Sequence, residues 1–301
     1  MNLNSVAFFE SVNQKNFRNM IKELNLVPPI IIKPNWGFSV VYTEAKILDW
    51  ILSAIDDEVI IIESYGWARN KEAVTKKEYG PMGVNDLRSS DQWFLDFSGI
   101  GKILKKHNVE YINITEEVWA KRIVDPTIIQ RHVEDLFPPV HNEEMYSYVP
   151  QRLYEMKKGT LLSLAKLKFM DPPLIISLSI KNLFGMLPGP DRGKFHGMDN
   201  ESLDQSVLDI NKIYRSLFNV NGIVEAIFTA SRGMTLDPTI YKEIGMVWAS
   251  KNTVELDAQV CTQVGLDPNL IGHIKVAAEC FGYWDENQLT QNQKNLSNIF
   301  P

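Results

Sequence analysis

The chain has 301 residues, 45% of them hydrophobic and 23% charged, which is the composition of a globular protein long enough to bury a large core. Its net charge of −6 at pH 7 is spread along the sequence and argues against non-specific nucleic-acid binding through a basic face. The two cysteines, Cys261 and Cys280, form no C-x-x-C pair and support neither a disulfide framework nor a cysteine-ligated zinc or iron–sulfur site.

The N-terminal part of the sequence predicts a β-α-β unit. Apolar runs at 6–9, 30–33 and 59–62 are predicted strands, and segments with helical spacing at 17–24 and 43–55 are predicted helices. The strands at 30–33 and 59–62 are almost entirely aliphatic, which is typical of parallel strands buried on both faces. A right-handed crossover is therefore expected between them.

A lobe boundary is predicted near residue 140. Polar, Gly- and Pro-containing residues first predict a long loop at 66–90. The elements that follow it are a helix at 93–106, a strand at 109–114 and a helix at 128–136. Pro138-Pro139 and the charged residues after them then mark the boundary.

The C-terminal part predicts a second set of strands and helices. The strands are predicted at 160–167, 174–180, 220–228 and 246–249, and the helices at 203–217, 253–264 and 268–280. The sequence thus predicts an α/β fold with a mostly parallel or mixed sheet, helices on both faces and two closely packed lobes. Their predicted bounds are 1–140 and 141–284, followed by a polar tail at 285–301 that is expected on the surface.

Two predicted strands end in a lysine that is followed closely by an asparagine. The first reads Ile30-Ile31-Ile32-Lys33-Pro34-Asn35, and the second runs from Leu174 to Lys181-Asn182. Pro34 lacks a backbone donor and pushes Lys33 toward extended geometry, so the strand should end there. In open α/β sheets, ligands bind beyond the carboxyl ends of the strands. Two lysines at that edge predict a site for an anion.

Other interpretations of these strand ends stay open. Lys33 could simply reach past the strand end into solvent. Glu63 ends the predicted strand at 59–62, where a carboxylate can pair with a lysine, act as a base or bind a metal, and structural pairing is the commonest of the three. No histidine has a second histidine three or four residues away, so no metal site is predicted.

The segment 185–197, directly after Lys181-Asn182, is a candidate ligand-binding loop. It contains four glycines, two prolines and the basic side chains of Arg192, Lys194 and His196. Its spacing matches neither a P-loop nor a dinucleotide fingerprint. A flexible cationic loop here could fold over an anion and offer His196 as an acid or base near neutral pH. The alternative is a plain surface loop with an exposed histidine.

The sequence resembles the family catalogued as domain of unknown function 362. The resemblance rests on Ile32-Lys33-Pro34-Asn35, the core Lys181-Asn182-Leu183-Phe184-Gly185, the pair Phe195-His196 and the helix start from Ser250 to Asp257. It covers about residues 28–284, and the combination of motifs is specific although each motif alone is weak.

Two departures from the family pattern bear on function. The family's Lys-x-His segment corresponds to Lys168-Phe169-Met170, and its aspartate-glycine pair to Asn221-Gly222. Some members of the family are fused to ferredoxin-type modules, and no such extension is expected here. These departures weaken any claim of a shared proton or electron transfer, and they leave anion recognition by Lys33, Lys181 and His196 untouched. For Asp257, the alternative is a carboxylate that stabilises the first turn of a helix.

The leading hypothesis is a cytoplasmic α/β enzyme that binds a small carboxylate or phosphate in a crevice lined by lysine and asparagine. An oxidoreductase is one open reaction class. The candidate catalytic residues are His196 and Glu63. The candidate ligand-binding residues are Lys33, Asn35, Lys168, Lys181, Asn182, Arg192, Lys194 and Asp257.

Two further hypotheses stay open. The chain could be a non-catalytic module that binds a ligand or an external redox partner, which the ferredoxin-fused relatives suggest. Alternatively, both lysines could form internal ion pairs with Glu63, Asp257 or Glu225, without any ligand. The sequence names no cofactor and no oligomeric state. It predicts no membrane partner, because no run of about 18 apolar residues is present.

Overall fold

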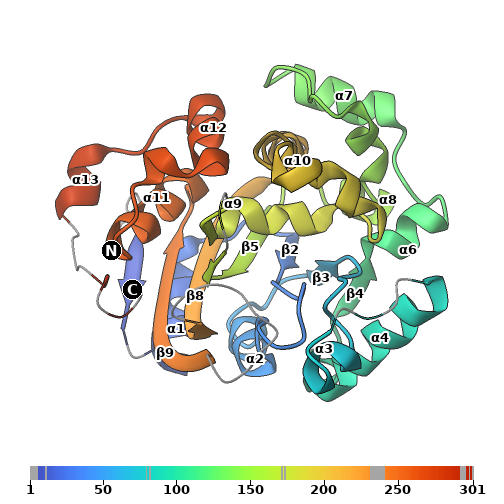
Figure 1. Cartoon of the computed structure of the whole chain (residues 1–301), viewed down its shortest axis with the longest axis horizontal. Helices are drawn as coiled ribbons and strands as arrows, with labels where there is room; N and C mark the ends of the chain where they lie inside the picture. The colour runs from blue at the N-terminus through green and yellow to red at the C-terminus, as the bar shows by residue number, and fades with distance from the viewer. Residues whose placement is uncertain are drawn as a thin grey trace.

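The computed structural model describes residues 6–10, 12–78, 80, 83–170, 172, 174–230, 241–291, 296–297 and 299. These residues form a seven-stranded sheet with helices packed around it (Figure 1). A separate sheet has two strands. The strand order of the large sheet is β1-β9-β8-β5-β2-β3-β4. The strands from β8 to β4 are parallel, whereas β9 is antiparallel to both of its neighbours. The predicted α/β fold with a mostly parallel sheet is confirmed.

The strands of the large sheet lie where apolar runs predict them. Their bounds are β1 (Ala7–Phe9), β2 (Ile30–Lys33), β3 (Val59–Glu63), β4 (Glu110–Asn113), β5 (Thr160–Lys166), β8 (Asn219–Ala230) and β9 (Tyr241–Ser250). Every residue of β2 and of β5 is buried, as expected for parallel strands covered on both faces. The small sheet contains β6 (Lys168–Phe169) and β7 (Ile176–Ser177).

The helices cover both faces of the large sheet, and successive residues of each strand face opposite sides. Ile31 and Ile60 face a core that includes residues of α10, α11 and α12, whereas Ile30 and Ile61 face a core that includes residues of α1, α2 and α5. The helix bounds are α1 (Gln14–Leu24), α2 (Ala45–Leu52), α3 (Lys71–Thr75), α4 (Val84–Phe97), α5 (Ile100–His107), α6 (Ile114–Trp119), α7 (Pro126–Glu134), α8 (Gln151–Glu155), α9 (Ser179–Asn182), α10 (Leu203–Leu217), α11 (Thr253–Gln263), α12 (Gly272–Phe281) and α13 (Glu286–Gln291).

The predicted strand at 174–180 is wrong. Only Ile176–Ser177 forms a strand there, paired with β6 outside the large sheet, and the chain then turns into the short helix α9. The backbone N–H groups of Ser179 and Ile180 donate to the carboxylate of Asp257 instead of to a neighbouring strand. Lys181 therefore lies in a helical turn rather than at a strand end.

Two other predicted segments differ from the structure. The predicted helix at 93–106 is two helices, α4 and α5, separated at Gly99, whose φ of 75° is unfavourable for residues with a side chain. The predicted loop at 66–90 contains α3 and the start of α4. None of the helices in the described part of the chain combines the length and apolar character needed to cross a bilayer.

Strands from both sides of residue 140 lie next to each other in the large sheet. β5 pairs with β2, and the N-terminal β1 pairs with β9. The division into lobes at 1–140 and 141–284 stays a prediction. In the predicted tail, Leu289 and Leu296 are buried.

Candidate functional site

A cavity of about 700 Å³ lies beyond the carboxyl ends of β2 and β3, and we call it the lysine pocket. Eight of the ten predicted site residues line it: Lys33, Asn35, Glu63, Lys168, Lys181, Asn182, Arg192 and His196. The two strand-like runs of the sequence thus bring Lys33 and Lys181 to one cavity, although only the first of them ends a strand of the large sheet. Lys194 and Asp257 are not among the residues that line it.

Lys33 and Glu63 form a buried ion pair at the base of the lysine pocket. The Lys33 Nζ lies 2.9 Å from the Glu63 Oε2 and also donates to the carbonyl oxygen of Pro34 at 2.7 Å. Both oxygens of Glu63 accept a backbone N–H, from Trp36 and from Ser64. Burial lowers the pKa of Lys33, and the charge of Glu63 opposes this shift. Lys33 is 1% exposed and does not reach solvent.

The backbone at residue 185 can lie this close to the ion pair because the residue is glycine. A Cβ atom at residue 185 would lie 2.8 Å from the Lys33 Nζ and 3.1 Å from a carboxylate oxygen of Glu63. A side chain there would displace the ion pair. The glycine of the Lys-Asn-Leu-Phe-Gly core therefore has a steric role.

The two asparagines connect the two lysine-asparagine motifs. The Asn35 Nδ2 donates to the Asn182 Oδ1 at 2.8 Å, and the Asn182 Nδ2 donates to the carbonyl oxygen of Lys33 at 3.0 Å. The Lys168 Nζ donates to the Asn35 Oδ1 at 2.6 Å. These hydrogen bonds of the asparagine side chains fix the relative positions of β2, β6 and α9 at the pocket. Both amides are used for positioning, and Lys168 is held at the pocket wall by one of them.

Lys168 and Lys181 provide positive charge without a carboxylate partner. In the described part of the chain, no carboxylate lies within ion-pair distance of either ammonium group. Burial lowers the pKa of Lys168 to about 7, and the charges of Lys181 and Lys33 add to the shift. Burial and the charge of Arg192 lower the pKa of Lys181 to about 8. The Lys181 Nζ lies 5.9 Å from the ring centre of Phe184.

Arg192 and His196 belong to the glycine-rich segment 185–197, and both line the lysine pocket. The guanidinium of Arg192 donates to the Ser64 Oγ at 2.9 Å and to the carbonyl oxygen of Tyr65 at 3.0 Å, which ties the loop to the end of β3. The His196 Nδ1 lies 2.8 Å from the Asn200 Oδ1. Burial lowers the pKa of His196, so its ring is neutral at pH 7 and can accept a proton.

The two predicted site residues outside the pocket have other partners. Lys194 forms an ion pair with Glu144, and its side chain is 45% exposed. Asp257 is fully buried on α11 and accepts hydrogen bonds from the backbone of Ser179 and Ile180 and from the Ser179 Oγ. Burial raises the pKa of Asp257 to about 7. Asp257 therefore positions the start of α9 and, through it, Lys181.

Sequence reasoning did not identify the apolar wall of the lysine pocket. That wall consists of Phe38, Trp67, Met170, Pro172, Leu174 and Phe184. No spacing in the sequence separates these residues from core residues. Among the residues that the structure describes, no cluster of three His, Cys, Asp or Glu side chains could hold a metal ion.

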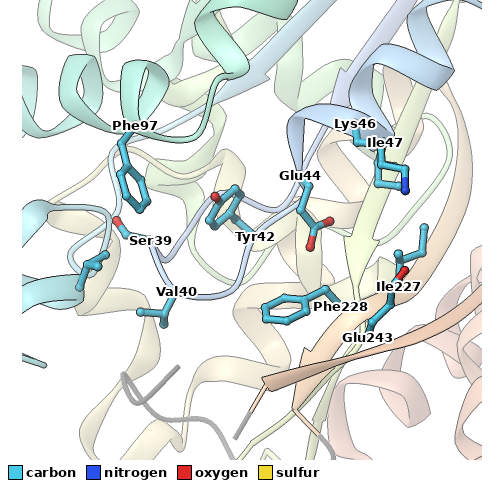
Figure 2. Close-up of a pocket in the computed structure, with 11 residues that line it drawn as sticks. Ser39, Val40, Tyr42, Glu44, Lys46, Ile47, Phe97, Ile227, Phe228 and Glu243 are labelled. Carbon is cyan, nitrogen blue, oxygen red and sulfur yellow. The ribbon is translucent and has the colours of Figure 1, made fainter. Parts of the chain in front are cut away.

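A second cavity, of about 430 Å³, lies beside the segment 38–44 and differs from the lysine pocket in the charge of its lining residues (Figure 2). Figure 2 shows the side chains of Tyr42, Glu44 and Phe228 lining this cavity. The Lys166 Nζ lies 3.0 Å from Glu44 and 2.8 Å from Glu225. The described charged residues that line the cavity are one lysine, Lys46, and two carboxylates, Glu44 and Glu243, so this cavity has no excess of positive charge for an anion.

The fold and the lysine pocket together define an α/β protein with a cation-rich cavity at the carboxyl edge of a parallel sheet. The chain belongs to the family described as domain of unknown function (DUF362), whose model matches residues 30–262. The family resemblance inferred from the motifs is thus confirmed, and the matched region contains every residue of the lysine pocket described above. No curated protein and no solved structure matched the chain.

Proposed function

We propose that the lysine pocket binds a small organic anion through a carboxylate or phosphate group, and that the protein is a cytoplasmic enzyme acting on that anion. The observation that carries the proposal is the imbalance of charge. Lys33, Lys168, Lys181 and Arg192 line the cavity, whereas Glu63 is the one carboxylate among the described lining residues. Glu63 is already bound to Lys33. Uncompensated buried charge is costly, and a bound anion would remove that cost.

The residues that line the pocket also support a ligand with both an anionic group and an apolar part. Lys168 and Lys181 would hold the anionic group, while Phe38, Trp67 and Phe184 offer apolar surface to the rest of the molecule. His196 would supply proton transfer, because its ring is neutral near pH 7 and lines the same cavity. A redox reaction would in addition need a cofactor or an external redox partner.

Lys181→Met tests the binding of the anion. Methionine keeps most of the apolar stem of lysine but removes the unpaired charge, so the ligand should be lost while the fold survives. The measurement is native mass spectrometry of freshly purified protein, with circular dichroism as the check on folding. The wild type should carry the mass of an anion that is missing from the variant.

Lys194→Met is the matched control, since Lys194 comes from the same loop but pairs with Glu144 outside the cavity. It should retain the anion. An equal occupancy in the wild type and in Lys181→Met would contradict the proposal.

His196→Gln separates an enzyme from a non-catalytic binding module. The variant should bind the identified anion but turn it over about 10²- to 10⁴-fold more slowly, which is the usual contribution of a general acid or base. Turnover of the anion by the purified protein is the measurement. Release of the anion unchanged by the wild type, with or without reduced ferredoxin, would favour the binding module.

A further inference from the structure

A third cavity, of about 550 Å³, lies at the opposite edge of the large sheet, where the parallel strands begin, and we call it the arginine pocket. Its lining includes Thr160 and Asn219, the first residues of β5 and β8. Arg215 from the last turn of α10 and Cys280 from α12 also line it. The arginine pocket therefore shares no residue with the lysine pocket.

Arg215 is held in place but is not neutralised. Its Nη2 donates to the Thr253 Oγ1, and its guanidinium carbon lies 4.4 Å from the ring centre of Phe281. Its Nε is buried and has no hydrogen-bond partner among the residues that the structure describes. No carboxylate in the described ranges lies within ion-pair distance of it. Arg215 is partly buried, and Asp257, an acid whose charge acts on it, does not lie within ion-pair distance, so an anion in the cavity would find the guanidinium unpaired.

The other polar groups of the arginine pocket are donors or neutral. Lys251 adds a second cation, and the amides of Asn25 and Asn221 are available. Asn221 is 7% exposed, and its side chain forms no hydrogen bond to a described residue. The described lining contains no aspartate or glutamate. An arginine in the last turn of a helix also offsets the helix dipole, but this does not explain the absence of acids around it.

We infer that the arginine pocket is a second ligand site, which binds a phosphate group carried by a small molecule. Two cations match the charge of a phosphate dianion, and a phosphate group offers the guanidinium and the amide donors three acceptor oxygens, whereas a carboxylate offers two. The cavity is larger than a phosphate ion, so the rest of the ligand also fits within it. The inference does not depend on the function proposed for the lysine pocket.

Cys280 allows a local test of this inference. It lines the arginine pocket and is partly exposed, whereas Cys261 is fully buried and serves as the internal control. The folded protein is treated with iodoacetamide, a neutral reagent, with inorganic phosphate or with acetate at matched ionic strength. Mass spectrometry then gives the alkylation rate at Cys280. Phosphate should slow this reaction several-fold and saturably, while acetate should have little effect.

Two variants show whether the phosphate that protects Cys280 binds in the arginine pocket or in the lysine pocket. In Arg215→Gln, the phosphate concentration needed to protect Cys280 should rise about tenfold or more, because a charge-assisted hydrogen bond is lost. In Lys181→Met, protection should be unchanged, so a failure of the lysine-pocket proposal leaves this test intact. If Arg215→Gln does not fold, Lys251→Gln replaces it, since Lys251 is exposed and should tolerate the change. Equal rates with phosphate and acetate, or full protection in the folded variant, would overturn the inference.

Discussion

Lys168 illustrates how the surroundings of a single residue set the chemistry of the lysine pocket. Its ammonium group is buried near the cations Lys181, Lys33 and Lys166, and its one hydrogen-bond partner in the described ranges is the neutral Asn35. Burial and these charges bring its pKa to about 7. Lys168 can therefore change charge close to neutral pH, and a bound anion would favour its charged form.

The titration of Lys168 predicts a pH dependence of stability. Its pKa in the folded state, about 7, lies below the value of 10.5 for a free lysine, so between these values the unfolded chain binds more protons. The free energy of unfolding should therefore rise with pH from 7 to 9 without ligand. Lys168→Met should lose about 1–2 kcal/mol of this rise. Urea unfolding of both proteins at pH 7 and pH 9 is the measurement.

Three other buried groups among the described residues titrate in or at the edge of this window, but all three are present in both proteins. Lys181, whose pKa is lowered to about 8, adds to the rise in both. Asp257 and Glu225 have pKa values raised to about 7 and lose the protons that they hold in the folded state near the lower end of the window. The difference between the two proteins therefore reports on Lys168. An identical rise in the wild type and in Lys168→Met would show that Lys168 keeps its charge when the protein is folded.

Sequence could predict the polar residues of the lysine pocket better than the apolar ones. Lys33, Asn35 and Glu63 stand out because charged and amide side chains directly follow buried strands. Phe38 and Trp67 do not stand out, because an aromatic residue that lines a cavity has the same local pattern as one in the core. Only the packing of distant segments separates the two cases.

At the scale of elements, α9 shows why an apolar run is not always a strand. The residues from Leu174 to Ile180 have the β-branched content of a strand, yet the chain forms two strand residues and then a helical turn. A carboxylate that is far away in sequence, on α11, accepts the first N–H groups of that turn. The residues of the run favour a strand, but hydrogen bonds to a carboxylate far away in sequence stabilise a helical turn at its end.

Asp257→Asn tests this positioning. The amide cannot accept all three hydrogen bonds that the carboxylate receives from Ser179 and Ile180, so the free energy of unfolding should fall by about 1–3 kcal/mol. Because the start of α9 moves, binding of the anion at Lys181 should weaken as well. Urea unfolding and native mass spectrometry measure the two effects.

Asp209→Asn is the matched control. Asp209 is also a fully buried carboxylate that accepts two backbone N–H groups, those of His141 and Asn142, but it does not line the lysine pocket. This variant should be destabilised to a similar degree and keep the anion. If both variants lose the anion equally, the role of Asp257 is only structural.

At the scale of the whole molecule, the large sheet places the two candidate sites at opposite edges. The carboxyl ends of β2 and β3 border the lysine pocket, and the amino ends of β5 and β8 border the arginine pocket. The aliphatic runs predict parallel strands, but the order in which they pair depends on contacts between residues far apart in sequence. The pairing of β2 with β5, which lies across the predicted lobe boundary, could not be derived from local patterns.

The central claim is that an anion belongs between Lys168 and Lys181. The most direct test is a crystal structure of the protein with bromide at pH 6, where both lysines should be charged, using the anomalous signal of bromide. A bromide ion is expected in the lysine pocket, in contact with both ammonium groups. Bromide ions elsewhere on the protein with none in the pocket, or Lys181 paired with a carboxylate in a filled crevice, would contradict it.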